Sequence, residues 1–492
     1  MRRNVLLVAL LVISGSAFAQ ELPQVDTTAA PAATPITLEQ ALQIALSQNA
    51  SVRVADKEIE RTGYAKKGTY SALYPQIDGN AAYQRTIKKQ VMYMDFDIGS
   101  FGGGAGMGGD SESIPGMEDI DIPTPGGSGK GGGIEVGRWN TWTAGLNAAM
   151  PLVNAQLWES LKISDKDVEL AVEKARGSRL ETVNQVKQAY YAALLAKDAF
   201  NVYKLLYENA MENYNQTLRK YNAQRASELD LTRAKTNVAN AIPAVYDAEN
   251  SMVLTIWQLK AVMGIDLSQE IDVVGGLNDY VDEMLKDNSA SSDLSLVNNT
   301  SLRQLSLQAE QLANTIKLQR YASIPSLALS FSFSLNAMTN DFKFSEFNWS
   351  PYSAVGLSLA IPIFSGGKRA YAVRQARVQA QELDIQRENT ERQLRIAIQQ
   401  SLFQMDMASK SYTAALSALE SAQKAYSIAS MSYNVGRSTL TDLNDAQAAL
   451  TQAQLSVTQS IYSFVVTKAT LENTLGADFI EESYYTKLNN NK

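Results

Sequence analysis

Apolar and polar residues alternate in several short stretches of the chain. The alternation is strict over residues 141–150, 327–336 and 354–361, and weaker over residues 77–86. A period of two is typical of β-strands, and about ten residues in a strand span about 33 Å. One face of each strand would be apolar and the other small and polar. A soluble β-sandwich and an outer-membrane barrel both give this pattern, so the alternation leaves the two open.

Elsewhere the period is seven. Large residues recur every seven positions from Ile398 to Tyr433, and from Val186 to Tyr221, and small residues mostly follow three positions later. A strict seven-residue repeat is typical of left-handed coiled coils. We predict long helices over residues 154–219 and 368–432, each about 100 Å long at about 1.5 Å per residue. An ordinary four-helix bundle is the alternative, which the helix length and the attached strands disfavour.

Shorter helical patterns accompany these long ones. A helix is predicted from residue 37, with Thr37 as its N-cap, to about residue 70. The seven-residue pattern also restarts after each long helix, which predicts two return helices. Pro243 falls inside the first return helix and is expected to interrupt and kink it.

The two halves of the chain are copies of each other. Matching residues lie at a constant offset of 212: Tyr221 with Tyr433, Asp230 with Asp442, and Gly264 with Gly476. The first copy holds about 39 extra residues, which fits the acidic, Gly-rich stretch 95–133. This stretch is interpreted as a mobile, solvated loop between two strands, although its carboxylates could attract cations.

These patterns divide the chain into six parts. We assign residues 1–19 to a signal peptide, 20–35 to a flexible linker, 36–266 to the first repeat, 267–299 to an inter-repeat segment, 300–478 to the second repeat and 479–492 to a tail.

The N-terminus and the composition narrow the function. Two arginines, a short apolar run and an Ala17-Phe18-Ala19 site indicate a secretory signal peptide that is cleaved after Ala19. Loss of Arg2 and Arg3 changes the formal net charge from −7 to −9, which argues against binding to nucleic acid. The 492 residues include no cysteine and no histidine, so we expect no N-terminal lipid, no disulfide and no enzymatic activity.

Four amphipathic strands per chain raise a problem of closure. Outer-membrane barrels begin at about eight strands, and open strand edges are not tolerated in lipid. If the strands enter a membrane, several chains must therefore share one barrel. Three chains would supply twelve strands, and the helices would continue the tube outside the membrane.

Three stretches, ITLEQALQIALSQN from residue 36, GLSLAIPIFSGGKR over 356–369 and YNVGRSTLTDLNDA over 433–446, point to one family. The chain resembles the outer-membrane efflux proteins, the TolC-like export channels of Gram-negative bacteria. The resemblance implies an α+β membrane protein: a homotrimer with a twelve-stranded β-barrel among outer-membrane lipids, a periplasmic α-helical barrel and a mixed equatorial region near residues 264–299 and the tail. It implies no cofactor. The implied partners are a periplasmic adaptor (membrane fusion protein) and an inner-membrane pump.

The residues after the second turn are the candidate gate. Asp442 and Asp445 share one helix face, so three chains would place six carboxylates around a narrow pore. The resemblance implies an acidic ring at these positions, tied shut by bonds that involve Tyr433, Asp230 and an arginine. Ser438 stands at the position of that arginine, and Arg437 lies one residue earlier. The alternative is that both acids are solvated residues favoured at a helix start.

The two turns themselves resemble the tips that contact the adaptor. The tip residues are Ala223, Gln224 and Arg225 in the first copy and Val435, Gly436 and Arg437 in the second. Gln224 stands where the family usually has glycine, so the tight left-handed turn is expected to be disturbed there.

The leading hypothesis is a passive export duct of a tripartite efflux or type I secretion system, which carries drugs, small molecules or proteins. The alternative is a structural one, a coiled-coil shaft or adhesin anchored by a barrel. A shaft would not need both halves to turn back at a tip, so the duplicated hairpin favours the duct.

Overall fold

The computed structural model describes residues 34–92, 134–286 and 295–477. The predicted signal peptide, residues 20–33 of the linker, the whole Gly-rich loop 95–133, residues 287–294 and the predicted tail lie outside the described residues. The chain forms two compact units, Met1–Ala65 with Asp165–Ala313 and Arg377–Lys492, and Lys66–Ser164 with Asn314–Ala376.

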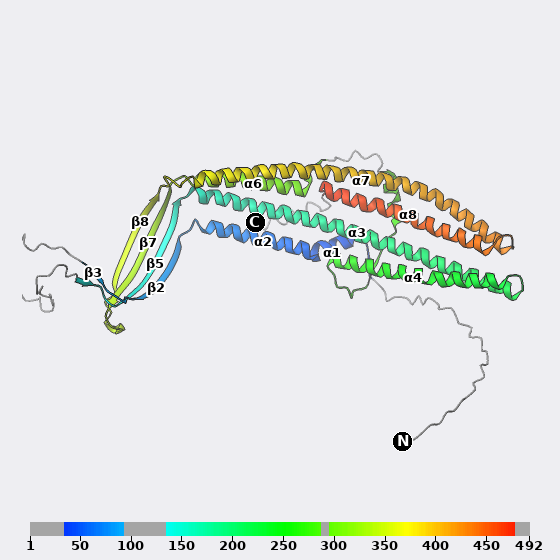
Figure 1. The fold of residues 1–492 in the computed structure, drawn as a ribbon, viewed down its shortest axis with the longest axis horizontal. Helices are drawn as coiled ribbons and strands as arrows, with labels where there is room; N and C mark the ends of the chain where they lie inside the picture. Colours follow the sequence, from blue (N-terminus) through cyan, green and yellow to red (C-terminus); the bar gives the residue numbers. More distant parts are fainter. Residues whose placement is uncertain (1–33, 93–133, 287–294, 478–492) are drawn as a thin grey trace, which may run out of the picture. The chain divides into compact units, whose positions relative to one another are not determined.

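Both halves of the chain contain the same series of elements (Figure 1). The first half runs α2 (Ala50–Ser71), β2 (Gln76–Arg85), β5 (Asn140–Val153), α3 (Ala155–Asn222) and α4 (Glu228–Met263). The second runs α6 (Thr300–Tyr321), β7 (Ser326–Thr339), β8 (Ser350–Ala360), α7 (Lys368–Asn434) and α8 (Leu440–Leu475). The predicted long helices are confirmed, with 68 residues in α3 and 67 in α7. The predicted interruption of α4 at Pro243 was wrong, since the helix continues through this residue. The predicted kink at Pro243 stays a prediction.

The second unit is built around a four-stranded antiparallel sheet in the order β2-β5-β7-β8. Strand β5 of the first half pairs with β7 of the second, from Asn140 opposite Thr339 to a bulge near Pro151. The weak pattern over residues 77–86 is therefore a strand, β2, at one edge of the sheet. Strand β8 forms the other edge, and its apolar side chains Val355, Leu357 and Leu359 are exposed. Strands β3 (Gln90–Met92) and β4 (Ile134–Val136) form a separate two-stranded antiparallel sheet.

The first unit has its largest core where the chain's short elements meet the helices. Strand β1 (Thr34–Ile36) pairs in parallel with β6 (Ile271–Val273), so the last two residues of the predicted linker, 34 and 35, lie in a strand. Helix α1 (Leu38–Gln48) begins at the predicted cap Thr37, which forms a capping box with Gln40. Tyr190 of α3 is buried, and its hydroxyl donates to the carbonyl oxygens of Ile36, in β1, and of Val274, directly after β6.

The remaining short elements complete this core. The 3₁₀ helix η2 (Leu277–Tyr280) and α5 (Val281–Lys286) bury Leu277 and Met284 there, and η4 (Leu296–Asn298) leads into α6. In the other unit, η5 (Phe344–Glu346) lies between β7 and β8. The predicted mixed region thus contains β6, η2 and α5 of the inter-repeat segment together with β1.

Two asparagines interlock the start of one helix with the end of another. Asn49 precedes α2, accepts the N–H of Ser51 and donates from Nδ2 to the carbonyl oxygen of Val262, 2.7 Å away. Its counterpart Asn299 accepts the N–H of Leu302 and donates to the carbonyl oxygen of Thr474, also at 2.7 Å. Each asparagine therefore caps one helix N-terminus and satisfies a free carbonyl near a helix C-terminus.

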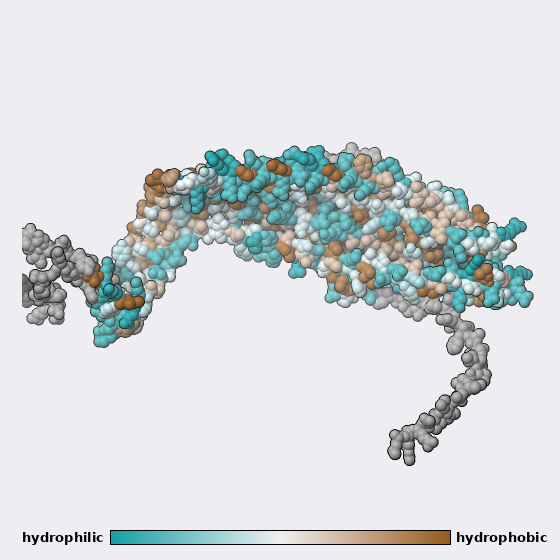
Figure 2. All heavy atoms as spheres, in the orientation of Figure 1, coloured by the Kyte–Doolittle hydropathy of each residue, from teal (hydrophilic) through white to brown (hydrophobic). Residues whose placement is uncertain are grey.

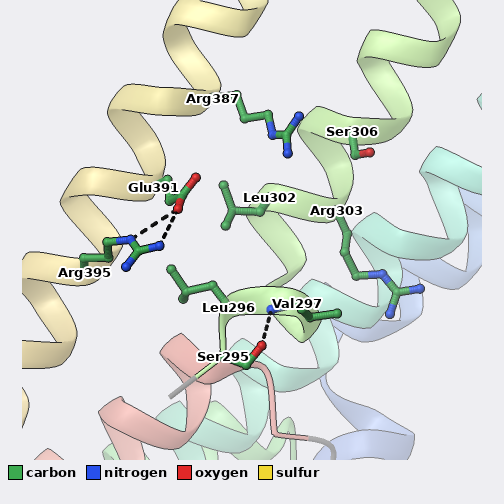
Figure 3. Close-up of a pocket in the computed structure, with 9 residues that line it drawn as sticks. All are labelled: Ser295, Leu296, Val297, Leu302, Arg303, Ser306, Arg387, Glu391 and Arg395. Atoms are coloured by element: carbon green, nitrogen blue, oxygen red, sulfur yellow. Dashed lines mark hydrogen bonds and ion pairs between the residues drawn. The ribbon is translucent and has the colours of Figure 1, made fainter. Parts of the chain in front are cut away.

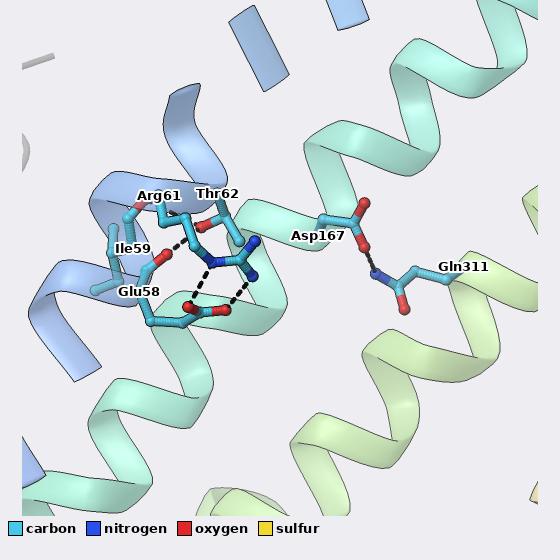
Figure 4. A network of polar contacts seen from close by, with 6 residues as sticks. All are labelled: Glu58, Ile59, Arg61, Thr62, Asp167 and Gln311. Carbon is cyan, nitrogen blue, oxygen red and sulfur yellow. Dashed lines mark hydrogen bonds and ion pairs between the residues drawn. The ribbon is translucent and has the colours of Figure 1, made fainter. Parts of the chain in front are cut away.

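Buried cations fasten α3 to its neighbours. The Arg179 guanidinium bonds Asp56 of α2, and Lys187 Nζ lies 2.7 Å from Glu472 Oε2 of α8. Figure 4 shows a further link, in which Gln311 of α6 donates to Asp167 of α3 beside an Arg61–Glu58 pair within α2. These bonds join α3 to α2, α6 and α8, and so they favour one register of the helices.

Several large apolar side chains on α7 remain exposed. They include Val378, Ile385, Ile396, Phe403 and Met407. Figure 2 shows hydrophobic residues scattered among hydrophilic ones on the visible face of the molecule. In the described ranges, no helix contains a stretch both long enough and apolar enough to cross a membrane.

Candidate functional site

We call α3–α4 the first hairpin and α7–α8 the second, and we call residues 223–227 and 435–439 their tips. In the first tip, Gln224 has a φ of 55° and its N–H bonds the carbonyl of Tyr221. The next N–H, that of Arg225, bonds the carbonyl of Lys220 at 2.7 Å. This left-handed residue ends the helix and satisfies two of its last carbonyls.

The second tip has the same hydrogen bonds. Gly436 has a φ of 76°, its N–H bonds the carbonyl of Tyr433, and the Arg437 N–H bonds the carbonyl of Ser432 at 2.8 Å. The expectation that Gln224 disturbs the turn was therefore wrong. A left-handed residue with a side chain costs about 1–2 kcal/mol, and the fold tolerates this cost at the first tip.

Each return helix starts with a capping box. Ser227 and Asp230 form it in the first hairpin, and Thr439 and Asp442 in the second. The Asp442 carboxylate accepts the Thr439 N–H at 3.0 Å and the hydroxyls of Thr439 and Ser438 at 2.7 and 2.9 Å. These bonds, the backbone one first, hold the pKa of Asp442 below its ordinary value. Asp445, one turn further along, is exposed.

Tyr433 anchors the second tip to the first hairpin. Only 7% of its surface is exposed, and its hydroxyl lies 2.6 Å from Oγ1 of the fully buried Thr217. The hydroxyl of Thr217 donates to the carbonyl of Asn213, so the proton of the bond to Tyr433 comes from the tyrosine. Lys220 Nζ donates to the carbonyl of Tyr433 at 2.8 Å and lies 3.9 Å from its ring centroid.

Hydrogen bonds of side-chain amides also join the two hairpins farther from the tips. The buried Gln447 of α8 donates to the carbonyl of Leu206 at 3.1 Å and accepts from Asn213 at 3.5 Å. Asn237 of α4 donates to Asn444 of α8 at 3.1 Å. The interface between the hairpins is therefore partly polar, and its bonds have specific geometry.

A cleft of about 460 Å³ lies between the two tips. It brings together five of the sequence-predicted residues, Arg225, Asp230, Tyr433, Val435 and Gly436, with the basic Lys220 beside them. Ala223, Gln224, Arg437, Asp442 and Asp445 do not line it. Its lining includes two basic side chains, Lys220 and Arg225, and one carboxylate, that of Asp230.

A second cleft, of about 450 Å³, lies between α6 and α7 (Figure 3). Arg303, Arg387 and Arg395 line it with Glu391, whose Oε1 accepts two hydrogen bonds from Arg395. Within the described ranges, no three acidic side chains gather in a way that could hold a metal ion.

Sequence reasoning missed Thr217 and Lys220. Thr217 occupies a small-residue position of the seven-residue series, where the second copy has Ala429. A threonine where the second copy has alanine was a signal for a buried hydrogen bond. Lys220 carried no comparable signal, because a lysine in the last turn of a helix is common on solvated surfaces.

Comparison with known proteins agrees with this geometry. The family model described as "Outer membrane efflux protein" matches residues 41–265 and 292–477. The chain belongs to the outer membrane efflux protein family. The matched residues include both hairpins and all four strands of the sheet, so the family likeness extends over both repeats.

Individual relatives have low sequence identity to this chain, but they align with long stretches of it. The outer membrane protein TolC of Escherichia coli (strain K12) is 21% identical over 360 residues, which cover 71% of this chain and 72% of TolC. The alkaline protease secretion protein AprF of Pseudomonas aeruginosa is 23% identical over 242 residues, 48% of this chain and 49% of AprF. The crystal structure of the Campylobacter jejuni CmeC outer membrane channel aligns with a TM-score of 0.67 and 19% identity, over 92% of this chain and 88% of CmeC.

The family assignment decides between the two hypotheses of the sequence. An outer membrane efflux protein is a transport channel, so the duct is favoured over the coiled-coil shaft or adhesin.

Proposed function

We propose that three copies of this efflux protein form one channel. Their twelve strands would close a β-barrel in the outer membrane of a Gram-negative bacterium, after cleavage of the signal peptide behind Ala19. Two features support this proposal: β2 and β8 are unpaired edges in the described chain, and α7 exposes a row of apolar residues. Open edges are not tolerated in lipid, and apolar stripes of helices call for a partner.

The assembly can be measured directly. Light scattering of the protein in mild detergent should give the mass of a trimer, and the trimer should dissociate on heating in SDS. N-terminal sequencing of the outer-membrane fraction should begin at Gln20. A monomer in mild detergent, under conditions where the protein remains folded by circular dichroism, would contradict the shared barrel.

The helical ends of this channel carry the proposed gate. In a trimer, Asp442 and Asp445 of three chains would surround the periplasmic entrance with six carboxylates, which favour cations and resist close approach. The observation that carries this proposal is that both hairpins of one chain end side by side, joined at the tips by the bonds of Tyr433 to Thr217 and Lys220. Asp442 has a second task as a helix cap, so Asp445 is the cleaner probe.

Planar bilayer recordings test the gate. Replacement of both aspartates by alanine should raise conductance and weaken the preference for cations, and Asp445→Asn alone should act in the same direction. Glu420→Gln is a matched control, because Glu420 is an exposed acid of α7 paired only with Lys424 in its own helix. If the aspartate variants and the control conduct alike, the gate lies elsewhere.

The tips would also dock the partners. We place the periplasmic adaptor of an inner-membrane pump on residues 223–225 and 435–437, because these residues are exposed and flank the tip cleft. Photo-crosslinking groups at Gln224 and Val435 should capture one partner in cells, whereas a group at Lys410, in the middle of α7, should not. Equal capture at all three positions would count against specific docking.

A further inference from the structure

A third cleft, of about 430 Å³, lies in the second repeat where the sheet meets the helices. The end of α6 and the start of α7 form its walls, and the loop that joins β8 to α7 completes it (Figure 1). All of its lining residues belong to the second compact unit. Arg320 and Arg369 are among these described residues, and none of them is acidic. The cleft therefore has a positive charge.

Both arginines have hydrogen-bond donors left for a ligand. The Nε of Arg369 donates to Oγ of Ser365 at 2.9 Å, and its Nη1 donates to the carbonyl oxygen of Pro362 at 3.0 Å. These bonds fix the side chain and use only some of its N–H groups. The exposed guanidinium of Arg320, on the opposite wall, forms no hydrogen bond or ion pair with another residue of the described ranges. Such a pair of guanidinium groups fits an anion.

The apolar face of the sheet leads into this cleft. Exposed apolar residues recur at every second position along β8 and the loop after it: Val355, Leu357, Leu359, Ile361 and Ile363. At the cleft itself, Ile363 is 91% exposed and Phe364 87%. In the proposed barrel this face of the sheet would meet lipid. Pairing of the β8 edge with another chain uses groups in the plane of the sheet, so it would leave the face uncovered.

The first repeat has aromatic residues where the second has these arginines. When the two copies are aligned on the prolines beside their strands, Tyr70 and Trp158 stand at the positions of Arg320 and Arg369. Aromatic side chains also favour a membrane interface, but they form no ion pair with a phosphate. Only the second repeat therefore combines an apolar surface with two cations at this level.

We propose that this cleft binds the phosphate of a phospholipid in the inner leaflet of the outer membrane. Arg320 and Arg369 hold the phosphate, and Ile363 and Phe364 lie among the acyl chains. Guanidinium groups form paired, charge-assisted hydrogen bonds with phosphate. A free phosphate would leave the apolar pair in water, whereas a lipid covers it. The inference rests on the proposed barrel, and a trimer would hold three such lipids, one per chain.

Native mass spectrometry of the full-length protein in mild detergent, with added phosphatidylglycerol, tests the site. Bonds to a charged group shift an equilibrium about tenfold or more, so Arg320→Gln should raise the Kd of the lipid about tenfold. Arg320 is a cleaner probe than Arg369, which also holds the loop through Ser365 and Pro362. Lys317→Gln is the matched control, because Lys317 is an exposed cation of α6 that does not line the cleft. It should bind the lipid as wild type does.

Two further ligands identify the chemistry that the cleft recognises. Diacylglycerol with the same acyl chains lacks the phosphate and should bind at least about tenfold more weakly than phosphatidylglycerol. Inorganic phosphate at an equal concentration should not displace the lipid. Equal binding of diacylglycerol, or displacement by inorganic phosphate, would overturn the lipid site. Equal losses in Arg320→Gln and Lys317→Gln would also overturn it, because the overall charge would then explain the binding.

The mass of the protein separates this inference from the proposed channel. A trimer in which wild type and Arg320→Gln bind phosphatidylglycerol alike would overturn the lipid site and leave the shared barrel standing. A folded monomer in mild detergent would overturn both, because the apolar face would then belong to no closed barrel. Circular dichroism of each variant verifies that it is folded before its lipid binding is compared.

Discussion

A residue with a positive φ follows each of the four hairpin helices, at the tips after α3 and α7 and at the return ends after α4 and α8. The two kinds of position differ in the space that they leave for a side chain. After α4 and α8, Gly264 and Gly476 have φ values of 77° and 71°. A Cβ on Gly476 would lie 2.2 Å from the carbonyl oxygen of Asn298, and one on Gly264 would lie 2.8 Å from that of Gln48. At the tips, a Cβ on Gly436 would meet nothing within 4 Å.

The difference explains why a tip can hold a residue other than glycine at its left-handed position. At the return ends, a side chain would strain the backbone and also collide with a neighbouring segment. At the tips, only the strain of the left-handed conformation opposes a side chain, about 1–2 kcal/mol. Gln224 occupies that conformation with the same hydrogen bonds as Gly436. A tip can therefore vary its surface without a change of fold.

The largest expected effect is at the return ends. Gly476→Ala should lower the free energy of unfolding by about 3–5 kcal/mol, from backbone strain and the collision with Asn298 together. Gly436→Ala is the matched control and should cost only about 1 kcal/mol. Urea unfolding followed by circular dichroism measures both. Similar costs at the two positions would remove the distinction between the ends.

An exchange between the tips should have a smaller effect. Gln224→Gly should stabilise the protein by about 1 kcal/mol, because glycine adopts a positive φ without strain. Gly436→Gln should destabilise it by about the same amount and leave the turn intact. Both changes can be followed as shifts of the urea midpoint. A loss of stability in Gln224→Gly would mean that the Gln224 side chain makes a contribution larger than its strain.

The smallest effect concerns the two helix caps. Asp442 accepts the hydroxyl of Ser438, whereas Asp230 has Ala226 at the matching position. Because the folded-state pKa of Asp442 is lowered, its contribution to stability is present above the unfolded pKa of about 3.9 and is lost as pH falls through the folded value. Wild type should therefore be more stable than Asp442→Asn at pH 7.

The pH dependence supplies the check. The difference in unfolding midpoint between wild type and Asp442→Asn should narrow as pH falls from 7 through the lowered pKa of Asp442, where the aspartate becomes protonated. Ser438→Ala should partly reduce the difference in unfolding midpoint that Asp442→Asn causes at every pH above about 4, because it removes one hydrogen bond to Asp442, as Ala226 does beside Asp230. A difference that is constant with pH would show that the charge of Asp442 plays no part in the cap.

Much of the fold could be predicted because the patterns were local and repeated. The seven-residue series placed α3 and α7, and strict alternation placed β5, β7 and β8. Strand β2 was weak in sequence, with polar Asp78 and Asn80 among its residues, and it forms through its pairing with β5. The capping signal at Thr37 was sufficient by itself, because a capping box depends on residues three apart.

The sequence by itself determined the duplicated order of elements, the positions of the tips and the family, because these depend on periodicity, turn residues and local motifs. Only the tertiary structure decided that Gln224 keeps the left-handed turn and that Tyr433 is held by Thr217 and Lys220. The last contact joins residues 216 and 213 positions apart. A hydrogen bond requires two groups at a defined distance, and no local pattern records that distance.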